Sequence, residues 1–162
     1  EDNTKIDNYF IHSKGVHYQG NWMGGLPHGP GTAIYPDGAY YVGNFDEGEA
    51  HDSNGYLIFP NGSQYQGNVV KSKLEGKGKL THKLGYSYAG EWADNSRRVG
   101  VETYEDGNYY RGFFVKGLKH CFDEGRTIQD KKAKKPQKLG LMKNGEDMYE
   151  GEFKDGLMHG YG

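Results

Sequence analysis

The sequence predicts an all-β fold, an elongated, twisted and open antiparallel meander of stacked β-hairpins. Three observations predict it: 27 of the 162 residues are glycine, 23 are aromatic (14 Tyr, 7 Phe, 2 Trp), and a Tyr-x-Gly triplet returns about every 23 residues. So much glycine disfavours a helical bundle. The aromatic content and the net charge of −2 are not typical of disorder. We therefore expect strands whose buried surface is mostly aromatic.

The triplet defines the first strand of each repeat. Its tyrosines are Tyr18, Tyr41, Tyr65, Tyr88, Tyr110 and Tyr149. Two residues after each triplet glycine stands a large apolar residue: Trp22, Phe45, Val69, Trp92, Phe114 and Phe153. Alternate residues of a strand share one face, so the tyrosine, the glycine and the apolar residue lie on the same side. We expect the glycine, which has no Cβ, to let rings lie on the backbone.

The second strand of each repeat ends in a turn signal. GTAIYPDG (31–38) has counterparts at 55–62, 78–85 and 100–107. Asp-Gly and Asn-Gly favour a two-residue hairpin turn. Between the two strands we expect a looser glycine-rich turn, as in GGLPHGPG (24–31). All connections are short, so neighbouring strands are antiparallel.

The spacing also divides the chain. Residues 1–7 are an N-terminal tail, and 8–162 form the repeat array, with a half repeat at 8–15 and repeats starting near 18, 41, 65, 88, 110 and 149. A basic insertion at 121–138 interrupts the fifth repeat. The chain begins at Glu1 and ends at Gly162, and we expect it to be a segment of a longer protein.

The pattern resembles the MORN (membrane occupation and recognition nexus) repeat family, in which Tyr-x-Gly-x-Trp is followed by His-Gly-x-Gly and Asp-Gly. The similarity is clearest in YQGNWMGGLPHGPGTAIYPDG (18–38) and YEGEFKDGLMHGYG (149–162). It covers 8–162 apart from the insertion. Several repeats depart from the pattern, with Val69 for an aromatic residue and Arg98-Val99 for His-Gly, so we expect local bulges.

The resemblance implies an interaction role. MORN arrays are similar to scaffolds or tethers in cilia, in cytoskeletal complexes and at membrane junctions, and one binds a myosin tail. They also precede SET-domain lysine methyltransferases and accompany plant phosphatidylinositol phosphate kinases. A regulatory or substrate-docking module of an enzyme is therefore the alternative.

Catalytic and metal chemistry find little support. His28, His51, His120 and His159 each follow a repeat tyrosine by ten residues. Equivalent residues on successive hairpins are about 9–10 Å apart, whereas a zinc–nitrogen bond is about 2 Å, so we expect no metal site. Asp37, Asn61 and Asp106 are explained as turn residues. No P-loop or dinucleotide fingerprint is present, so we expect no cofactor and no enzyme within this segment.

The aromatic residues are the predicted protein-binding site. Stacked repeats align the tyrosines in one column and the apolar residues in a second, and one sheet has nothing of its own to cover that face. Either the rings pack on one another and the sheet buries the face by twisting, or the face accepts an amphipathic helix or a second copy of the chain. The predicted partner-binding residues are Tyr18, Trp22, Tyr41, Phe45, Tyr65, Tyr88, Trp92, Tyr110, Phe114, Tyr149 and Phe153.

The insertion is the predicted anion-binding site. Residues 124–143 hold seven basic and two acidic residues, a net charge of +5. Lysines near an anionic bilayer each contribute about 1 kcal/mol of attraction. An acidic protein, a localisation signal and a solvated loop are the alternatives. Nucleic acid is not expected, because the rest of the chain is acidic. The predicted residues are Lys131, Lys132, Lys134, Lys135 and Lys138.

These observations predict a non-enzymatic scaffold or tether, associated with the cytoskeleton, a cilium or a membrane junction. No apolar run reaches 18 residues, and no signal peptide is visible. One cysteine, Cys121, excludes an internal disulfide and fits a reducing compartment. We therefore expect a cytoplasmic location.

Overall fold

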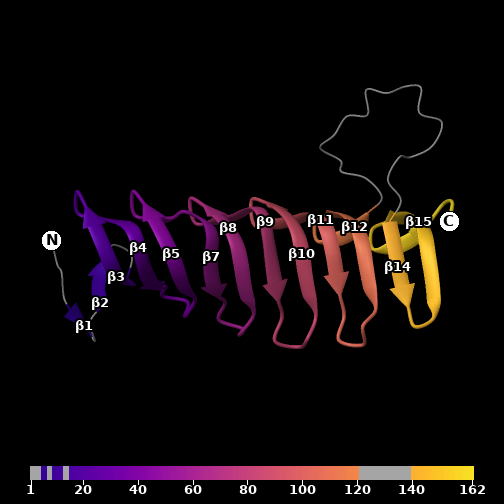
Figure 1. Ribbon diagram of the computed structural model, residues 1–162, viewed down its shortest axis with the longest axis horizontal. Coiled ribbons are helices and arrows are strands. Elements are labelled where there is room, and N and C mark those ends of the chain that lie inside the picture. Colours follow the sequence, from indigo (N-terminus) through magenta and orange to yellow (C-terminus); the bar gives the residue numbers. More distant parts are fainter. Residues whose placement is uncertain (1–4, 7–8, 13–14, 121–139) are drawn as a thin grey trace, which may run out of the picture.

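The computed structural model describes residues 5–6, 9–12, 15–120 and 140–162. Their sixteen strands form one antiparallel sheet, and successive hairpins lie side by side along its length (Figure 1). Neighbours in the sequence are neighbours in the sheet, except that β6 and β13 lie off the main path and pair with β5 and β12. The all-β meander is confirmed. The basic insertion falls on residues outside the described part.

The strands follow the repeat closely, two per hairpin, and two second strands are split. They are β1 (Lys5–Ile6), β2 (Tyr9–His12), β3 (Val16–Met23), β4 (Leu26–Ile34), β5 (Tyr40–Asp46), β6 (Glu49–Ala50), β7 (Asp52–Ile58), β8 (Gln64–Val70), β9 (Lys73–Thr81), β10 (Ser87–Ala93), β11 (Ser96–Thr103), β12 (Tyr109–Val115), β13 (Leu118–His120), β14 (Gly140–Asn144), β15 (Asp147–Lys154) and β16 (Leu157–His159).

Tight two-residue turns close each hairpin just after its aromatic residue, at what we call the tip. Both turn residues have positive φ, for example Gly24 (60°) with Gly25 (79°) and Asp94 (48°) with Asn95 (64°). This is the signature of the turn whose twist matches paired strands. The looser turn expected over 24–31 is therefore wrong: β4 already begins at Leu26.

At the opposite ends, the loops at 36–38, 60–62, 83–85 and 105–107 have three residues, so the two-residue turn expected there at Asp-Gly and Asn-Gly is wrong. In the last hairpin Asn144 pairs with Asp147 across a two-residue turn, as expected. In the loop at 60–62, Phe59 N–H donates to Ser63 O at 2.8 Å and Gly62 N–H donates to Phe59 O at 2.8 Å. The Asn61 side chain accepts from Ser63 N–H at 2.9 Å. Of the loop residues, only Gly62 has positive φ, because the asparagine closes the turn with its side chain.

A column of glycines crosses the sheet under the tyrosine rings. The register places Gly55 opposite Gly67, and Gly67 opposite Gly78. The Tyr65 ring lies on Gly67 and Gly78, where an added Cβ would overlap its ring or hydroxyl atoms. The other repeat tyrosines lie on glycines in the same way. The expectation that rings rest on the backbone at these glycines is confirmed.

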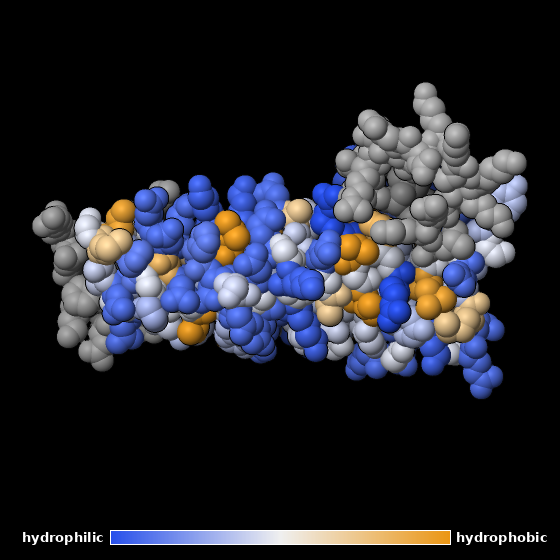
Figure 2. Space-filling view, turned by 45° about the horizontal axis from the view of Figure 1, so that its top comes forward, coloured by the Kyte–Doolittle hydropathy of each residue, from blue (hydrophilic) through white to orange (hydrophobic). Residues whose placement is uncertain are grey.

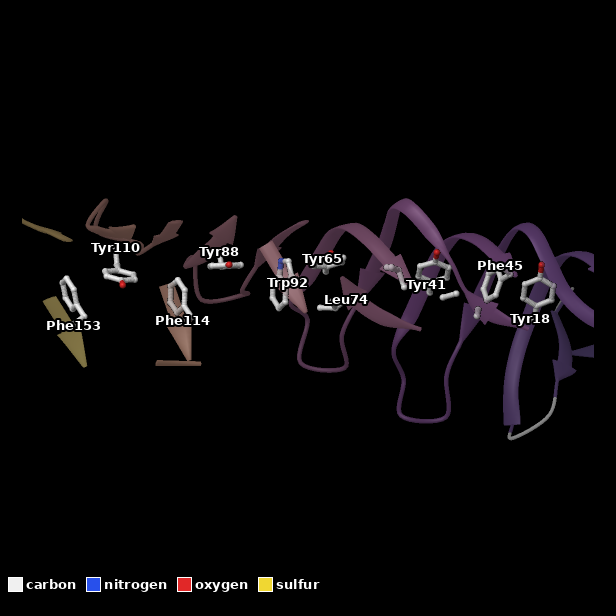
Figure 3. Packing of buried hydrophobic residues seen from close by; sticks show 13 residues of the cluster. Tyr18, Tyr41, Phe45, Tyr65, Leu74, Tyr88, Trp92, Tyr110, Phe114 and Phe153 are labelled. Carbon is white, nitrogen blue, oxygen red and sulfur yellow. The ribbon is translucent and has the colours of Figure 1, made fainter. Parts of the chain in front are cut away.

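The two expected aromatic columns merge into one row, in which tyrosines alternate with the second aromatic residue of each repeat (Figure 3). Tyr88 lies between Trp92 and Phe114, with both ring centroids 5.2 Å away and both rings at 88° to it. Phe45 lies between Tyr18 and Tyr41 at 4.8 and 5.2 Å. Each edge-to-face contact of this kind stabilises the fold by about 1 kcal/mol, in addition to the stabilisation from the apolar area that the rings bury.

The sheet covers this row itself, and the rings pack on one another, which is one of the alternatives that the sequence left open. β-bulges interrupt the register next to the tip, between Gly20 and Trp22 in β3 and between Glu91 and Trp92 in β10. A bulge bends its strand, and the tip ends curl beside the rings (Figure 3). Successive tips are joined by backbone hydrogen bonds, such as Gly48 N–H to Pro27 O at 3.0 Å.

Val69 is the weak point of the row, because it stands where other repeats place a ring between two tyrosines. A hollow of about 540 Å³ lies beside it. We expect Val69→Phe to stabilise the fold by about 1 kcal/mol, by restoring edge-to-face contacts with Tyr41 and Tyr65. Urea unfolding of both proteins measures this. Val70→Phe, on the other face of β8, is the matched control, and a lower midpoint for Val69→Phe would show that the row has no room there.

Candidate functional site

The residues predicted to bind a partner form the core. Nine of the eleven are at most 6% exposed, while Trp22 and Tyr149 are partly buried. The structure brings all of them together in the row described above. Binding of a partner by these rings stays a prediction. Because the rings are buried, the accessible side chains are those beside the row.

The tyrosine hydroxyls are used inside the fold. Each donates to the backbone carbonyl three residues later, as Tyr65 Oη does to Asn68 O at 2.9 Å and Tyr88 Oη to Glu91 O at 2.9 Å. Burial raises the pKa of Tyr65 and of Tyr88 to about 12. These groups are therefore neutral hydrogen-bond donors that stabilise the bend of each strand.

The raised pKa values predict alkaline unfolding. An exposed tyrosine ionises with a pKa of 10.0, whereas Tyr65 and Tyr88 ionise near 12 when folded. The folded state therefore holds these protons more tightly, and the stability they contribute is complete below pH 10 and is lost between pH 10 and 12. Tyrosinate absorbance and circular dichroism should change together in this range. Ionisation of every tyrosine near pH 10 with the fold intact would contradict the burial.

Two neighbouring hollows lie along the sheet between the tips and the three-residue loops. One hollow of about 540 Å³ is lined by residues that include Tyr35, Leu57, Phe59 and Leu74. A second of about 500 Å³ is lined by residues that include Leu80, Arg97, Glu102 and Tyr104. Asn95 lines both hollows, so they lie next to each other on the two sides of the tip at 94–95. We call these two hollows together the groove.

The sequence carries a second periodic signal, besides the tyrosine triplet, that indicates the groove. The residue just before each three-residue loop is an aromatic or imidazole ring: Tyr35, Phe59, His82 and Tyr104. These rings are partly buried, so they are available for contact. They stand two residues beyond the position that pairs with the repeat tyrosine, such as Leu57, and therefore share the face of the tyrosine row.

Charged side chains line the second hollow or lie beside it: Arg97, Glu102 and Lys116 line it, and Lys119 lies next to its Tyr104. Arg97 forms an ion pair with Glu102, whose other carboxylate oxygen accepts from Tyr104 Oη at 2.5 Å. The Arg97 guanidinium lies 4.8 Å from the centre of the Phe114 ring, and Lys119 Nζ lies 5.0 Å from that of Tyr104. Glu102 occupies the register position that Leu57 and Leu80 hold in earlier repeats. The groove thus changes from apolar to charged along its length.

Other predicted sites are not assembled. The lysines Lys131, Lys132, Lys134, Lys135 and Lys138 lie outside the described residues, so their role in anion binding stays a prediction. His28 Nδ1 lies 3.5 Å from Asp46 Oδ1. Within 15–120 and 140–162, no three His, Cys, Asp or Glu side chains are grouped to hold a metal ion. The described part contains no helix with the length and hydrophobicity needed to span a membrane.

The face drawn in Figure 2 is largely hydrophilic, and its hydrophobic residues form separate patches. Large exposed apolar side chains occur near the C-terminal end, including Leu118 (48%), Leu157 (72%) and Met158 (56%).

The MORN repeat profile matches residues 18–40, 65–83, 88–109 and 149–162. The hairpins that begin at Tyr41 and Tyr110 lie outside these stretches, and in both the tyrosine rests on glycines and donates to the carbonyl three residues later. ALS2 C-terminal-like protein from Bos taurus is 31% identical over 119 residues, 70% of this chain and 10% of the relative. Alsin from Rattus norvegicus is 34% identical over 108 residues, 66% of this chain and 5% of the relative. The chain thus spans a tenth or less of these relatives.

Proposed function

Because the chain belongs to the MORN repeat family, we propose that it is a non-enzymatic scaffold or tether that holds a segment of a partner protein in its groove. The family's repeats are generally protein- or membrane-interaction modules, and the repeat itself is not catalytic. The observation that carries the proposal is the groove itself, which runs across repeats and is lined by partly buried aromatic and aliphatic side chains.

An amphipathic helix is the partner that suits this surface. The groove offers an apolar stretch over Leu57, Phe59 and Leu74, bordered by polar tip residues such as Ser72 and Asn95. The apolar stripe of an amphipathic helix is continuous along its axis and flanked by polar residues. Aromatic side chains in such contacts often dominate the binding energy.

The test is affinity capture followed by reconstitution. The groove variant is Phe59→Ser/Tyr104→Ser, and the matched control is Gln66→Ser/Lys79→Ser on exposed positions of the opposite face. We expect a protein captured by the unsubstituted chain and by the control to be lost with the groove variant. With purified components, the groove variant should weaken binding about 30-fold. Equal binding by both variants would contradict the groove, provided both unfold at the same urea concentration.

We also propose a cytoplasmic location and an association with the cytoskeleton, a cilium or a membrane junction. The resemblance to the family and the composition support these proposals. The alternative role is as a regulatory or substrate-docking module of an enzyme. A catalytic partner identified in the capture experiment would favour this alternative.

Lipid binding by the basic insertion rests on its charge alone. Co-sedimentation with phosphatidylserine vesicles, at low and high salt, tests it. Salt-sensitive pelleting that disappears when the five lysines become glutamine would support it, and salt-insensitive pelleting would contradict an electrostatic contact.

A further inference from the structure

A column of residues at the tips changes character along the groove. These residues pair across the sheet with the second apolar residue of each repeat, and we call them the tip column: Pro27, Ala50, Leu74, Arg97, Lys119 and Met158. The first three are buried, the next two are cations, and Met158 in the last repeat is apolar and exposed. Ala50 and Leu74 line the first hollow, whereas Arg97 lines the second. The groove therefore has an apolar N-terminal half and a cationic C-terminal half.

Arg97 is held in place by several contacts. Its guanidinium donates to Gly117 O at 2.9 Å, which joins two successive tips. It also stacks near the Phe114 ring and pairs with Glu102. The charge of Arg97 is thus matched by Glu102, and this ion pair is a fixed part of the groove wall.

Lys119 is the cation that the fold places among rings. Its Nζ lies 5.0 Å from the centre of the Tyr104 ring, 5.3 Å from that of Tyr110 and 4.0 Å from Met142 Sδ. Burial lowers its pKa, with Glu102 raising it and the nearby Arg97 lowering it. Glu102 therefore attracts two cations: it forms an ion pair with Arg97, and its charge also acts on Lys119. Lys119 borders the second hollow through Tyr104, and the exposed Lys116 lines that hollow directly. The C-terminal half therefore carries excess positive charge.

We infer that the groove selects a protein segment with apolar side chains at one end, over Leu57 and Leu74, and an acidic side chain at the other, beside Lys119. A carboxylate there would form a charge-assisted contact with a partly buried ammonium, which is stronger than the same contact in water. The pairing also fixes the direction in which the segment lies along the repeats. This inference rests on the proposed function and specifies the partner's chemistry.

Panning of phage-displayed random 12-residue peptides on the immobilised chain tests the inference. The chains compared are the unsubstituted protein, Lys119→Gln, Phe59→Ser and the exposed control Lys79→Gln. We expect the unsubstituted chain to select peptides with an apolar cluster and a separate Asp or Glu. For a selected synthetic peptide, Lys119→Gln should weaken binding about tenfold and reduce its salt dependence, while Lys79→Gln changes binding less than twofold.

The outcomes separate the two levels of the proposal. Apolar peptides without acidic residues, or acidic selection that persists in Lys119→Gln, would overturn this inference and leave the groove intact. Selection of no peptide sensitive to Phe59→Ser would overturn both. A parallel measurement with phosphatidylserine vesicles tests an anionic lipid surface as the other possible ligand of the cationic half. Vesicle binding that requires Lys119, without peptide selection, would overturn the inference and assign the cationic half to a membrane instead. Equal urea midpoints of all variants establish that folding is unchanged.

Discussion

Replacing Tyr88 with alanine is expected to lower the free energy of unfolding by about 4 kcal/mol, in the range typical of large aromatic deletions from a core. Tyr88 is fully buried and lies edge-to-face with Trp92 and Phe114, so its loss leaves a cavity in the middle of the row. Each repeat contacts mainly its neighbours, so the damage should be local at first. Urea unfolding measures the total effect, and hydrogen exchange should show protection lost in β10–β12 before β3–β5.

Tyr88→Phe is the matched control, because it keeps the ring and removes the hydroxyl that donates to Glu91 O at 2.9 Å. Leaving that carbonyl without its donor should cost about 1 kcal/mol. A loss for Tyr88→Ala no larger than that for Tyr88→Phe would mean that the ring is not packed as described.

Replacing Gly100 with alanine is expected to cost about 3 kcal/mol, because the added Cβ has no space. It would lie 2.5 Å from Ala89 O, 2.7 Å from Gly90 Cα and 2.9 Å from Tyr88 Cε2. Two of these atoms belong to the backbone of the neighbouring strand, which cannot move without breaking the sheet register. The backbone of Gly100 is outside the left-handed region, so the effect isolates crowding from conformational strain.

Arg111→Ala, on the adjacent strand and the exposed face, is the control, with an expected change within about 0.5 kcal/mol. Thermal unfolding of both variants checks the pair. Equal midpoints would show that the glycine column is dispensable and that the Tyr88 ring does not rest on it.

The fold could be predicted because the same strand pattern, a tyrosine, a glycine and a large apolar residue at alternate positions, recurs six times. The alternation of Tyr18, Gly20 and Trp22 fixes which face is apolar, and the short spacing leaves only antiparallel neighbours. The turns differ from the expectation in most hairpins, which have two-residue turns at the tips and three-residue loops at the opposite ends. Asp-Gly favours a two-residue turn in isolation, but Asp37 accepts a hydrogen bond from Ala39 N–H and closes a longer loop.

The pattern left open how the aromatic face is covered, since this depends on bulges whose effect on strand direction no residue pattern reveals. The residues with the strongest periodicity, which are the predicted binding residues, form the core. The groove beside them depends on which residues of separate repeats come together. Arg97 and Lys119 are 22 residues apart in the sequence, and only the register of β10–β11 and β12–β13 aligns them in one column.

Acetylation of tyrosines under native conditions, mapped by mass spectrometry, tests the central claim most directly, which is that the repeat tyrosines form the interior of the fold. Tyr161 is 86% exposed and serves as the reference. The structure predicts that Tyr161 reacts readily, while Tyr18, Tyr41, Tyr65, Tyr88 and Tyr110 react only after unfolding. Reaction of these five at the rate of Tyr161 in the folded protein would contradict the account.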